Sequence, residues 1–271
     1  MILTKNGIMY REWKPSAPPR AVFVAVHGLG AHSGRWDFFG AFCAERGFAV
    51  YAIELKGFGM TGGVRGHVDS LDTYYADIEK LGRICRDEHP GRRVFLVGES
   101  MGGLIAYLMA VSRGGVCDGL ICMSPAFRGI IPFGAAVYAD LFVSYYLNPT
   151  KQIRLPFTSA MCTRDEGYRA VMDASAEENR LGTAKTLGAI FLAQQYVRLT
   201  GQACAVPVLF LLSGDDKLVD PRASEEVFAR LRAPDKTVIR YPGMYHALSV
   251  DCGREKVFAD ILEWAAPRLG R

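Results

Sequence analysis

Five short, uninterrupted apolar runs, separated by longer segments, constrain the fold of this chain more than any other feature. The runs are Ala21–Val26, Phe48–Ile53, Val94–Val97, Gly119–Met123 and Val208–Leu212. A strand that is apolar on both sides fits a parallel sheet whose two faces are both covered. The sequence therefore predicts an α/β fold with a mostly parallel central sheet.

Helical spacing of apolar residues recurs between these runs. The segments are Trp36–Arg46, Leu71–Glu88, Met101–Arg113, Ala223–Leu231 and Glu255–Leu269. Alternation of strand and helix predicts right-handed βαβ units, with helices on both faces of the sheet. A last strand is expected at Thr237–Arg240. At the start, Asn6-Gly7 favours a type I′ hairpin turn, so Ile2–Trp13 is expected to add antiparallel edge strands.

The alternation stops between residues 125 and 206, where the sequence predicts helices and no strand. Residues 129–149 are apolar and aromatic with one charge, Asp140, and residues 164–198 have the pattern of an amphipathic helix. We predict a core of residues 1–124 and 207–271 and a mainly helical cap of residues 125–206. Its apolar side chains must cover something apolar. The cap either packs on the core or forms a lipid-chain pocket beneath it, with an outer face for membranes.

Composition excludes several classes of protein. Lys plus Arg is 32 against 28 for Asp plus Glu, without a basic run, so no nucleic-acid partner is expected. The seven cysteines form no CxxC pair or metal-like spacing, which indicates free, mostly buried thiols and no metal. The first residues do not resemble a signal peptide, and no apolar run reaches the roughly 18 residues of a membrane-spanning helix. We expect a soluble, cytoplasmic protein; the sequence does not indicate an oligomeric state.

A serine nucleophile is indicated at position 100. Residues 98–102 read GESMG and join the strand Val94–Val97 to a predicted helix. A serine on such a sharp turn has a strained backbone, and the flanking Gly98 and Gly102 leave room for strand and helix to approach. The strand before the motif and the helix after it make this pentapeptide far more specific than it is alone.

A serine hydroxyl needs a base to remove its proton and a carboxylate to orient that base. Of the five histidines, His246 lies in a loop after the last predicted strand, and we predict it as the base. The carboxylate is expected after Val208–Leu212, where three aspartates compete. Asp220 precedes Pro221 and fits a helix N-cap. Spacing alone leaves Asp215 and Asp216 as alternatives.

The order serine, aspartate, histidine along the chain is typical of α/β-hydrolases. The negative charge of the tetrahedral intermediate also needs N–H donors. One is predicted at the backbone of Met101, where the helix begins. The other is predicted at Leu29 in the loop His27–Gly30, since Gly28 and Gly30 let that backbone turn sharply and approach the ligand. His27 is expected to orient the loop. Nucleotide binding there would need a third glycine and an acidic residue, which are missing.

Four motifs in this order, HGLG, GESMGG, SGDDKLVD and YPGMYH, resemble those of the monoacylglycerol lipase and lysophospholipase branch of the α/β-hydrolases. Residues 27–36 and the turn at residues 55–63, LKGFGMTGG, are also similar to segments of that branch, and the resemblance spans Ala21 to Leu269. It implies the α/β-hydrolase fold and assigns the acid to Asp216. Asp215 remains the alternative, because the glycine of the usual "GxxD" pattern is displaced by one place.

This chain departs from that branch at four positions. Many relatives have an acidic residue where Ala31 stands, Lys56 and Phe58 replace an arginine and a histidine, and Glu99 precedes the serine where histidine is common. These changes leave the predicted triad intact but affect the expected recognition of a glycerol headgroup.

The sequence thus predicts an ester hydrolase that acts through an acyl-enzyme and requires neither cofactor nor metal. The resemblance implies a lipid substrate, a monoacylglycerol or lysophospholipid, with transient membrane contact through the cap. A general carboxylesterase, a thioesterase or a proline-type peptidase would use the same triad. A catalytically inactive binding protein of this fold is the alternative outside enzymes, and the intact Ser100, Asp216 and His246 argue against it.

Overall fold

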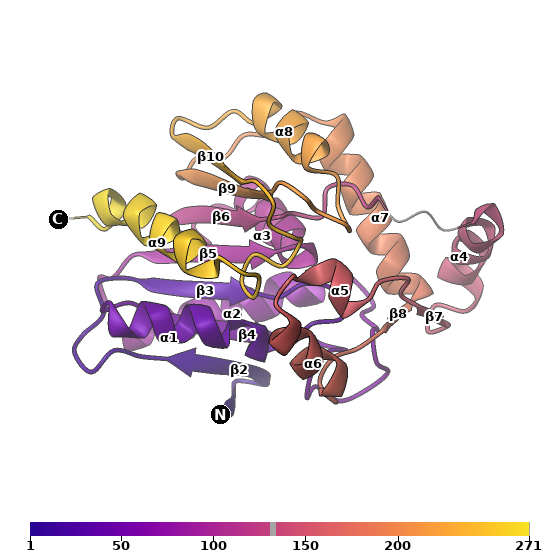
Figure 1. Cartoon of the computed structure of the whole chain (residues 1–271), viewed down its shortest axis with the longest axis horizontal. Coiled ribbons are helices and arrows are strands. Elements are labelled where there is room, and N and C mark those ends of the chain that lie inside the picture. Colours follow the sequence, from indigo (N-terminus) through magenta and orange to yellow (C-terminus); the bar gives the residue numbers. More distant parts are fainter. Residues whose placement is uncertain (131–133, 271) are drawn as a thin grey trace.

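A mixed eight-stranded sheet forms the centre of the molecule in the computed structural model, which describes residues 1–130 and 134–270 (Figure 1). Its strand order is β1-β2-β4-β3-β5-β6-β9-β10, and every pair from β4 to β10 is parallel. The strands are β1 (Ile2–Lys5), β2 (Ile8–Trp13), β3 (Val22–Val26), β4 (Ala49–Glu54), β5 (Val94–Glu99), β6 (Gly119–Met123), β9 (Val208–Ser213) and β10 (Lys236–Tyr241). The mostly parallel sheet that the apolar runs predict is confirmed.

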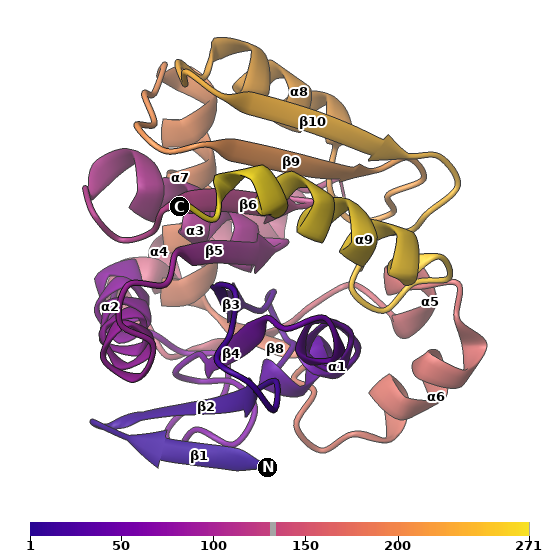
Figure 2. The ribbon, with the colours of Figure 1, turned by 90° about the vertical axis from the view of Figure 1, so that its left-hand side faces the viewer.

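Helices cover both faces of the sheet, as Figure 2 shows. On one face, α1 (Asp37–Glu45) and α9 (Arg254–Ala265) pack over a core that contains Phe23, Phe39 and Phe258. The other face is covered by α2 (Leu71–Glu88), α3 (Met101–Ser112) and α8 (Pro221–Arg230). The 3-10 turns η1 (Ser33–Trp36) and η2 (Ala266–Arg268) adjoin α1 and α9. The helices predicted from apolar spacing agree with these bounds to within a few residues.

The predicted hairpin at the start of the chain is confirmed. Asn6 and Gly7 have φ angles of 53° and 74°, the left-handed pair that a type I′ turn requires. β1 pairs antiparallel with β2, and β2 antiparallel with β4. The hairpin therefore forms the edge of the sheet beside β4.

Between β6 and β9 lies the segment that we call the cap, residues 125–206. Its elements gather at one end of the sheet (Figure 1) and are α4 (Ala135–Leu147), β7 (Gln152–Arg154), α5 (Ser159–Cys162), α6 (Glu166–Ala174), β8 (Leu181–Thr183) and α7 (Ala184–Leu199). The prediction that no strand occurs here was wrong, because β7 and β8 pair antiparallel. Strands of three residues are too short to show an alternating pattern. The division of the chain into core and cap domains stays a prediction.

The amphipathic helical pattern of residues 164–198 is divided between two helices, α6 and α7. α6 ends at Ala174, and α7 starts after Thr183, whose hydroxyl accepts a hydrogen bond from the Thr186 N–H as an N-cap. The intervening residues include a turn at residues 176 and 177 and the strand β8, and they contact the core. All seven cysteines are free, and six are buried, which agrees with the prediction. In the part of the chain that the structure describes, no helix is long and apolar enough to cross a membrane.

Candidate active site

Ser100 lies on a sharp turn between β5 and α3, with φ 57° and ψ −120°. A left-handed conformation of this kind is strained for any residue with a Cβ. The surrounding glycines make the turn possible. A Cβ on Gly98 would lie 2.2 Å from the Gly102 carbonyl oxygen, and one on Gly102 would lie 2.1 Å from the Val26 carbonyl oxygen. Strand and helix therefore approach too closely for any other residue, as the motif predicts.

His246 and Asp216 form a buried pair. The Nδ1 atom of His246 lies 2.8 Å from Oδ2 and 3.0 Å from Oδ1 of Asp216. The carboxylate is fixed in turn, because its Oδ1 accepts hydrogen bonds from the N–H groups of Leu218 (2.8 Å) and Val219 (2.9 Å). The two side chains are 5% and 1% exposed. The pair uses Nδ1 of the ring, and His246 also lines the cavity described below.

The two competing aspartates lie elsewhere. Asp215 is exposed, and its backbone N–H donates to the Met244 carbonyl. Asp220 is the N-cap of α8, where its carboxylate accepts from the Arg222 N–H at 3.0 Å, as the sequence predicts. Asp216 is thus the aspartate of the three that contacts the histidine.

The charge state of His246 is set by opposing effects. Burial lowers its pKa, but the charge of Asp216, the hydrogen bond to it and the charge of Glu99 together raise the pKa above its ordinary value. An environment of this kind stabilises the imidazolium that forms when the ring takes up a proton. A base in acyl transfer needs this property.

A cavity of about 850 Å³ is lined by five of the predicted site residues. From the core, it is lined by Gly28, Leu29, Ser100, Met101 and His246. From the cap, it is lined mainly by apolar side chains, among them Leu141, Phe142, Leu187, Ile190 and Phe191. Residues from separate loops thus share one cavity with an apolar wall.

The loop around Gly28 approaches the nucleophile closely. A Cβ on Gly28 would lie 3.1 Å from the Ser100 Cβ. His27 holds this loop in place: its Nδ1 lies 2.9 Å from the Gly28 carbonyl oxygen, and its Nε2 lies 3.1 Å from the Leu55 N–H nitrogen. These partners assign Nδ1 as the donor and Nε2 as the acceptor. Burial lowers the pKa of His27 to about 4, so the ring is neutral. Its contacts are those of an orienting residue.

The remaining histidines do not line the cavity. His32 accepts a hydrogen bond from the Gly34 N–H at the start of η1. His67 lies 2.9 Å from the Thr183 hydroxyl, and His89 lies 2.8 Å from the Tyr51 hydroxyl. Their contacts are structural ones.

Four charged residues that line the cavity were missed as site residues at the sequence level: Arg35, Glu99, Arg128 and Arg198. The Glu99 carboxylate is buried and accepts hydrogen bonds from the Ser249 N–H (2.9 Å) and hydroxyl (2.8 Å). It thereby ties the strand of the nucleophile to the loop of His246, and burial raises its pKa. Arg35 also lines the cavity and pairs with Glu178 of the cap. The sequence marked Glu99 as unusual, but no local pattern reveals partners this far away.

Comparison with known proteins agrees with this geometry. The family model described as serine aminopeptidase, S33, matches residues 17–253. The chain belongs to this family. It is 28% identical to the monoglyceride lipase of Homo sapiens, over 95% of this chain and 86% of the relative. It is 32% identical to a monoglyceride lipase homolog of Monkeypox virus, over 98% of this chain and 97% of the relative.

A solved structure of another protein has a similar fold. The crystal structure of Paleococcus ferrophilus monoacylglycerol lipase is similar to this chain with a TM-score of 0.85 and 25% sequence identity. The match covers 96% of this chain and 99% of that one. The α/β-hydrolase fold and the resemblance drawn from the motifs are thus confirmed for this member of the family.

Proposed function

We propose that the chain is a serine ester hydrolase that cleaves the acyl ester of a monoacylglycerol or lysophospholipid. One observation carries the proposal: the strained Ser100 and His246, whose ring is paired with the buried Asp216 carboxylate, border one cavity whose cap side is mainly apolar. The pair supplies acyl-transfer chemistry, and the wall suits a fatty acyl chain. The relatives named as lipases support the same substrate class.

In the proposed mechanism, the Ser100 hydroxyl attacks the ester carbonyl while His246 takes up its proton. Asp216 holds the imidazole in the correct tautomer and stabilises its cationic form. The backbone N–H groups of Leu29 and Met101 stabilise the oxyanion of the tetrahedral intermediate. His246 then protonates the departing alcohol, which leaves an acyl ester on Ser100. His246 next removes a proton from water, which attacks the acyl ester on Ser100. The fatty acid is released as the proton returns to the Ser100 oxygen. Neither cofactor nor metal is required.

The description of the family as aminopeptidases raises a second candidate, which the cavity disfavours. An aminopeptidase needs a carboxylate free to hold the ammonium group of its substrate. Glu99 is the acidic residue among the described residues that line this cavity, and Ser249 already occupies both of its oxygens. Arg198 also lines the cavity and would repel an ammonium, whereas Arg35 and Arg128 are paired with Glu178 and Asp220. An apolar acyl group is the better fit.

The preference for acyl-chain length tests this proposal. Across p-nitrophenyl esters from acetyl to dodecanoyl, we expect kcat/KM to rise by about 100-fold or more between the butyryl and octanoyl esters. Burial of each methylene is worth about 0.8 kcal/mol, so four of them account for roughly two powers of ten. Monoacylglycerol and lysophosphatidylcholine are assayed beside an aminoacyl p-nitroanilide. Activity confined to acetyl and butyryl esters would overturn the lipid assignment, and turnover of the anilide alone would indicate a peptidase.

We further propose that α4 touches a lipid surface. Its Val143 and Leu147 are 53% and 81% exposed and lie one turn apart, so they share a face. Other side chains of the same helix line the cavity. A helix exposed on one side and bordering an acyl cavity on another can take its substrate from a bilayer.

Vesicle binding tests this contact. We expect the double variant Val143→Ser, Leu147→Ser to bind phosphatidylcholine vesicles at least about fivefold more weakly than the wild type in flotation. Each of the two substitutions removes an apolar side chain from the lipid contact. Neither residue lines the cavity, so hydrolysis of p-nitrophenyl butyrate should be unchanged. Val171→Ser, which removes an exposed apolar side chain from α6, is the matched control. Equal flotation of the double variant and the control would contradict the proposal.

A further inference from the structure

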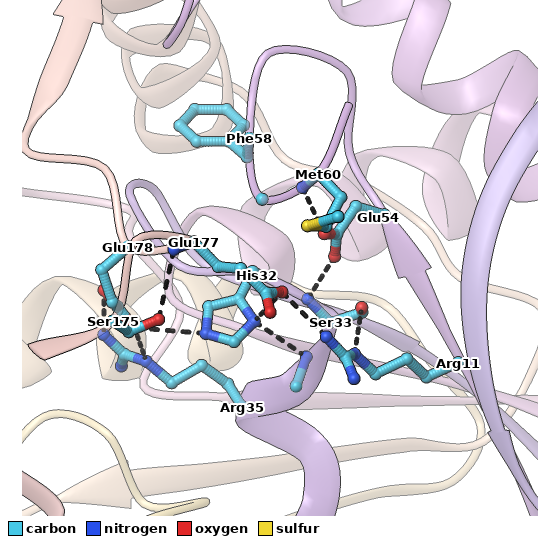
Figure 3. A network of polar contacts seen from close by, with 12 residues as sticks. Arg11, His32, Ser33, Arg35, Glu54, Phe58, Met60, Ser175, Glu177 and Glu178 are labelled. Carbon is cyan, nitrogen blue, oxygen red and sulfur yellow. Dashed lines mark hydrogen bonds and ion pairs between the residues drawn. The ribbon is translucent and has the colours of Figure 1, made fainter. Parts of the chain in front are cut away.

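The non-helical segment between α6 and β8 places two glutamates of the cap against the core (Figure 3). The Glu178 carboxylate accepts two hydrogen bonds from the Arg35 guanidinium, from Nε to Oε1 at 2.5 Å and from Nη2 to Oε2 at 2.8 Å. The side chains are 4% and 8% exposed. A forked, buried pair of this kind holds both partners in a fixed orientation.

Glu177 makes a second set of contacts beside the first (Figure 3). Its Oε2 accepts a hydrogen bond from Nη2 of Arg11 on β2 at 2.8 Å and lies 3.1 Å from Nδ1 of His32. Arg65 of the core adds Nη2 contacts of 3.3, 3.4 and 3.2 Å to the carbonyl oxygens of residues 176, 177 and 178. The chain from residue 176 to 178 is therefore held through both its side chains and its backbone.

The next residue, Asn179, lies directly on the loop that carries Leu29. Its buried backbone N–H donates to the Gly30 carbonyl at 2.7 Å. A Cβ on Gly30, which has a φ of 81°, would lie 2.4 Å from the Asn179 carbonyl oxygen, so the two backbones are in tight contact. We call Glu177, Glu178 and Asn179 the clasp.

The loop is thus fixed from two sides. On the core side, the Ser33 N–H donates to Oε2 of Glu54, at the end of β4, at 2.6 Å. On the cap side, the clasp holds Gly30 through Asn179 and Arg35 through Glu178. Ala31, in the same loop, is uncharged. The carboxylate that neutralises the Arg35 guanidinium is that of Glu178, in the cap. Loss of one partner of a buried ion pair leaves an uncompensated buried charge, which strongly destabilises the surrounding structure.

We propose that Glu178 is a positioning residue for hydrolysis: by holding Arg35 and the clasp in place, it keeps the N–H of Leu29 aimed at the oxyanion. The inference rests on the proposed function, because it requires an oxyanion at this point. The oxyanion exists only in the transition state and the tetrahedral intermediates, so a displaced donor affects kcat more than KM. Misplacement of a reacting group by about 1 Å can cost roughly 100-fold in rate.

Replacement of Glu178 with glutamine tests the clasp, because the amide keeps the shape of the side chain and removes its charge. With p-nitrophenyl octanoate, we expect kcat to fall by roughly 10- to 100-fold and KM to change by less than about threefold. The rate constant for labelling of Ser100 by a fluorophosphonate should fall by a similar factor, since this reaction also forms an oxyanion-like centre. Glu178→Asp keeps the charge and should recover part of the loss.

Asp165→Asn is the matched control. Asp165 joins the cap to Arg254 of α9 through an ion pair of 2.8 Å, and neither residue lines the cavity. Asparagine preserves the N-cap of α6 that Asp165 provides. We expect this variant to keep its kcat, even where its melting temperature falls as far as that of Glu178→Gln.

Three results would overturn the positioning role of Glu178 while the proposed function stands. They are unchanged kcat and labelling in Glu178→Gln, an equal loss of kcat in Asp165→Asn, or an effect of Glu178→Gln on KM alone. If Glu178→Gln does not fold, Glu178→Asp is compared with the control, and full activity of Glu178→Asp overturns the proposal. A wild-type protein that neither reacts with the fluorophosphonate nor hydrolyses any ester would overturn the proposed function and the clasp with it.

Discussion

Ser100→Ala is expected to lower kcat for ester hydrolysis by about 10⁶-fold, to a residual rate that depends on binding and the oxyanion donors alone. The loss is this large because no acyl-enzyme can form without the hydroxyl, whereas alanine keeps the Cβ and so the geometry of the turn. A fluorophosphonate should label the wild-type protein once per chain and leave the variant unlabelled, as intact mass measurement would show.

A second serine offers a close control for this prediction. Ser124 follows β6, is buried, and has a positive φ of 39°, like Ser100. Its hydroxyl has no hydrogen-bond partner within residues 1–130 and 134–270. Ser124→Ala should therefore keep full labelling and activity. Equal labelling of wild type and Ser100→Ala would show that another residue reacts, and an unlabelled wild type would favour a binding protein over an enzyme.

The core of the fold could be predicted because its physical cause is local. A strand in a sheet covered on both faces must be apolar along its whole length, and all five apolar runs are strands of the central sheet. Ser100 could be predicted for a related reason, since its motif is a short run of residues, and the close contact that requires Gly98 is with Gly102 in the same run. His246 could be predicted because it lies in the loop after the last strand, and this position can be read from the order of elements along the chain.

Asp216 could not be separated from Asp215 by the same reasoning. The two are adjacent after β9, and the choice depends on which side chain the following turn directs inward. The N–H groups of Leu218 and Val219 hold Asp216 toward His246, while Asp215 stays exposed. The resemblance to known lipases favoured Asp216, and the contact with His246 agrees with it. That these residues act as acid and base stays a prediction.

The cap was harder to predict because its stabilising contacts are distant in sequence. Arg35 and Glu178 are separated by 143 residues, and Arg11 and Glu177 by 166. No window of the sequence contains both partners of either pair, so the glutamates resemble ordinary exposed residues of an amphipathic helix. The segment that makes these contacts, residues 175–180, is not helical, and it interrupts the helical pattern of residues 164–198.

Asp216→Asn is expected to lower kcat by roughly 10⁴-fold. Asparagine fits the space, but it presents an N–H as well as an oxygen to Nδ1 and can stabilise the wrong tautomer of His246. It also carries no charge. Because the charge of Asp216 raises the pKa of His246, its loss lowers that pKa. The acid limb of the kcat/KM profile, where protonation of His246 stops turnover, should therefore move to lower pH in the variant.

Asp215→Asn provides the matched control, since it makes the same chemical change one residue away. Asp215 is exposed and makes no contact with His246 that would set its tautomer or its pKa, so activity and the position of the acid limb should stay within about twofold and a few tenths of a pH unit of the wild type. A large loss in Asp215→Asn together with full activity in Asp216→Asn would reverse the assignment of the carboxylate. Equal, small losses in both variants would mean that neither aspartate supports the base, because an imidazole that keeps its tautomer without Asp216 must be oriented by another group. The two variants therefore separate the charge that contacts the ring from the charge that merely lies nearby.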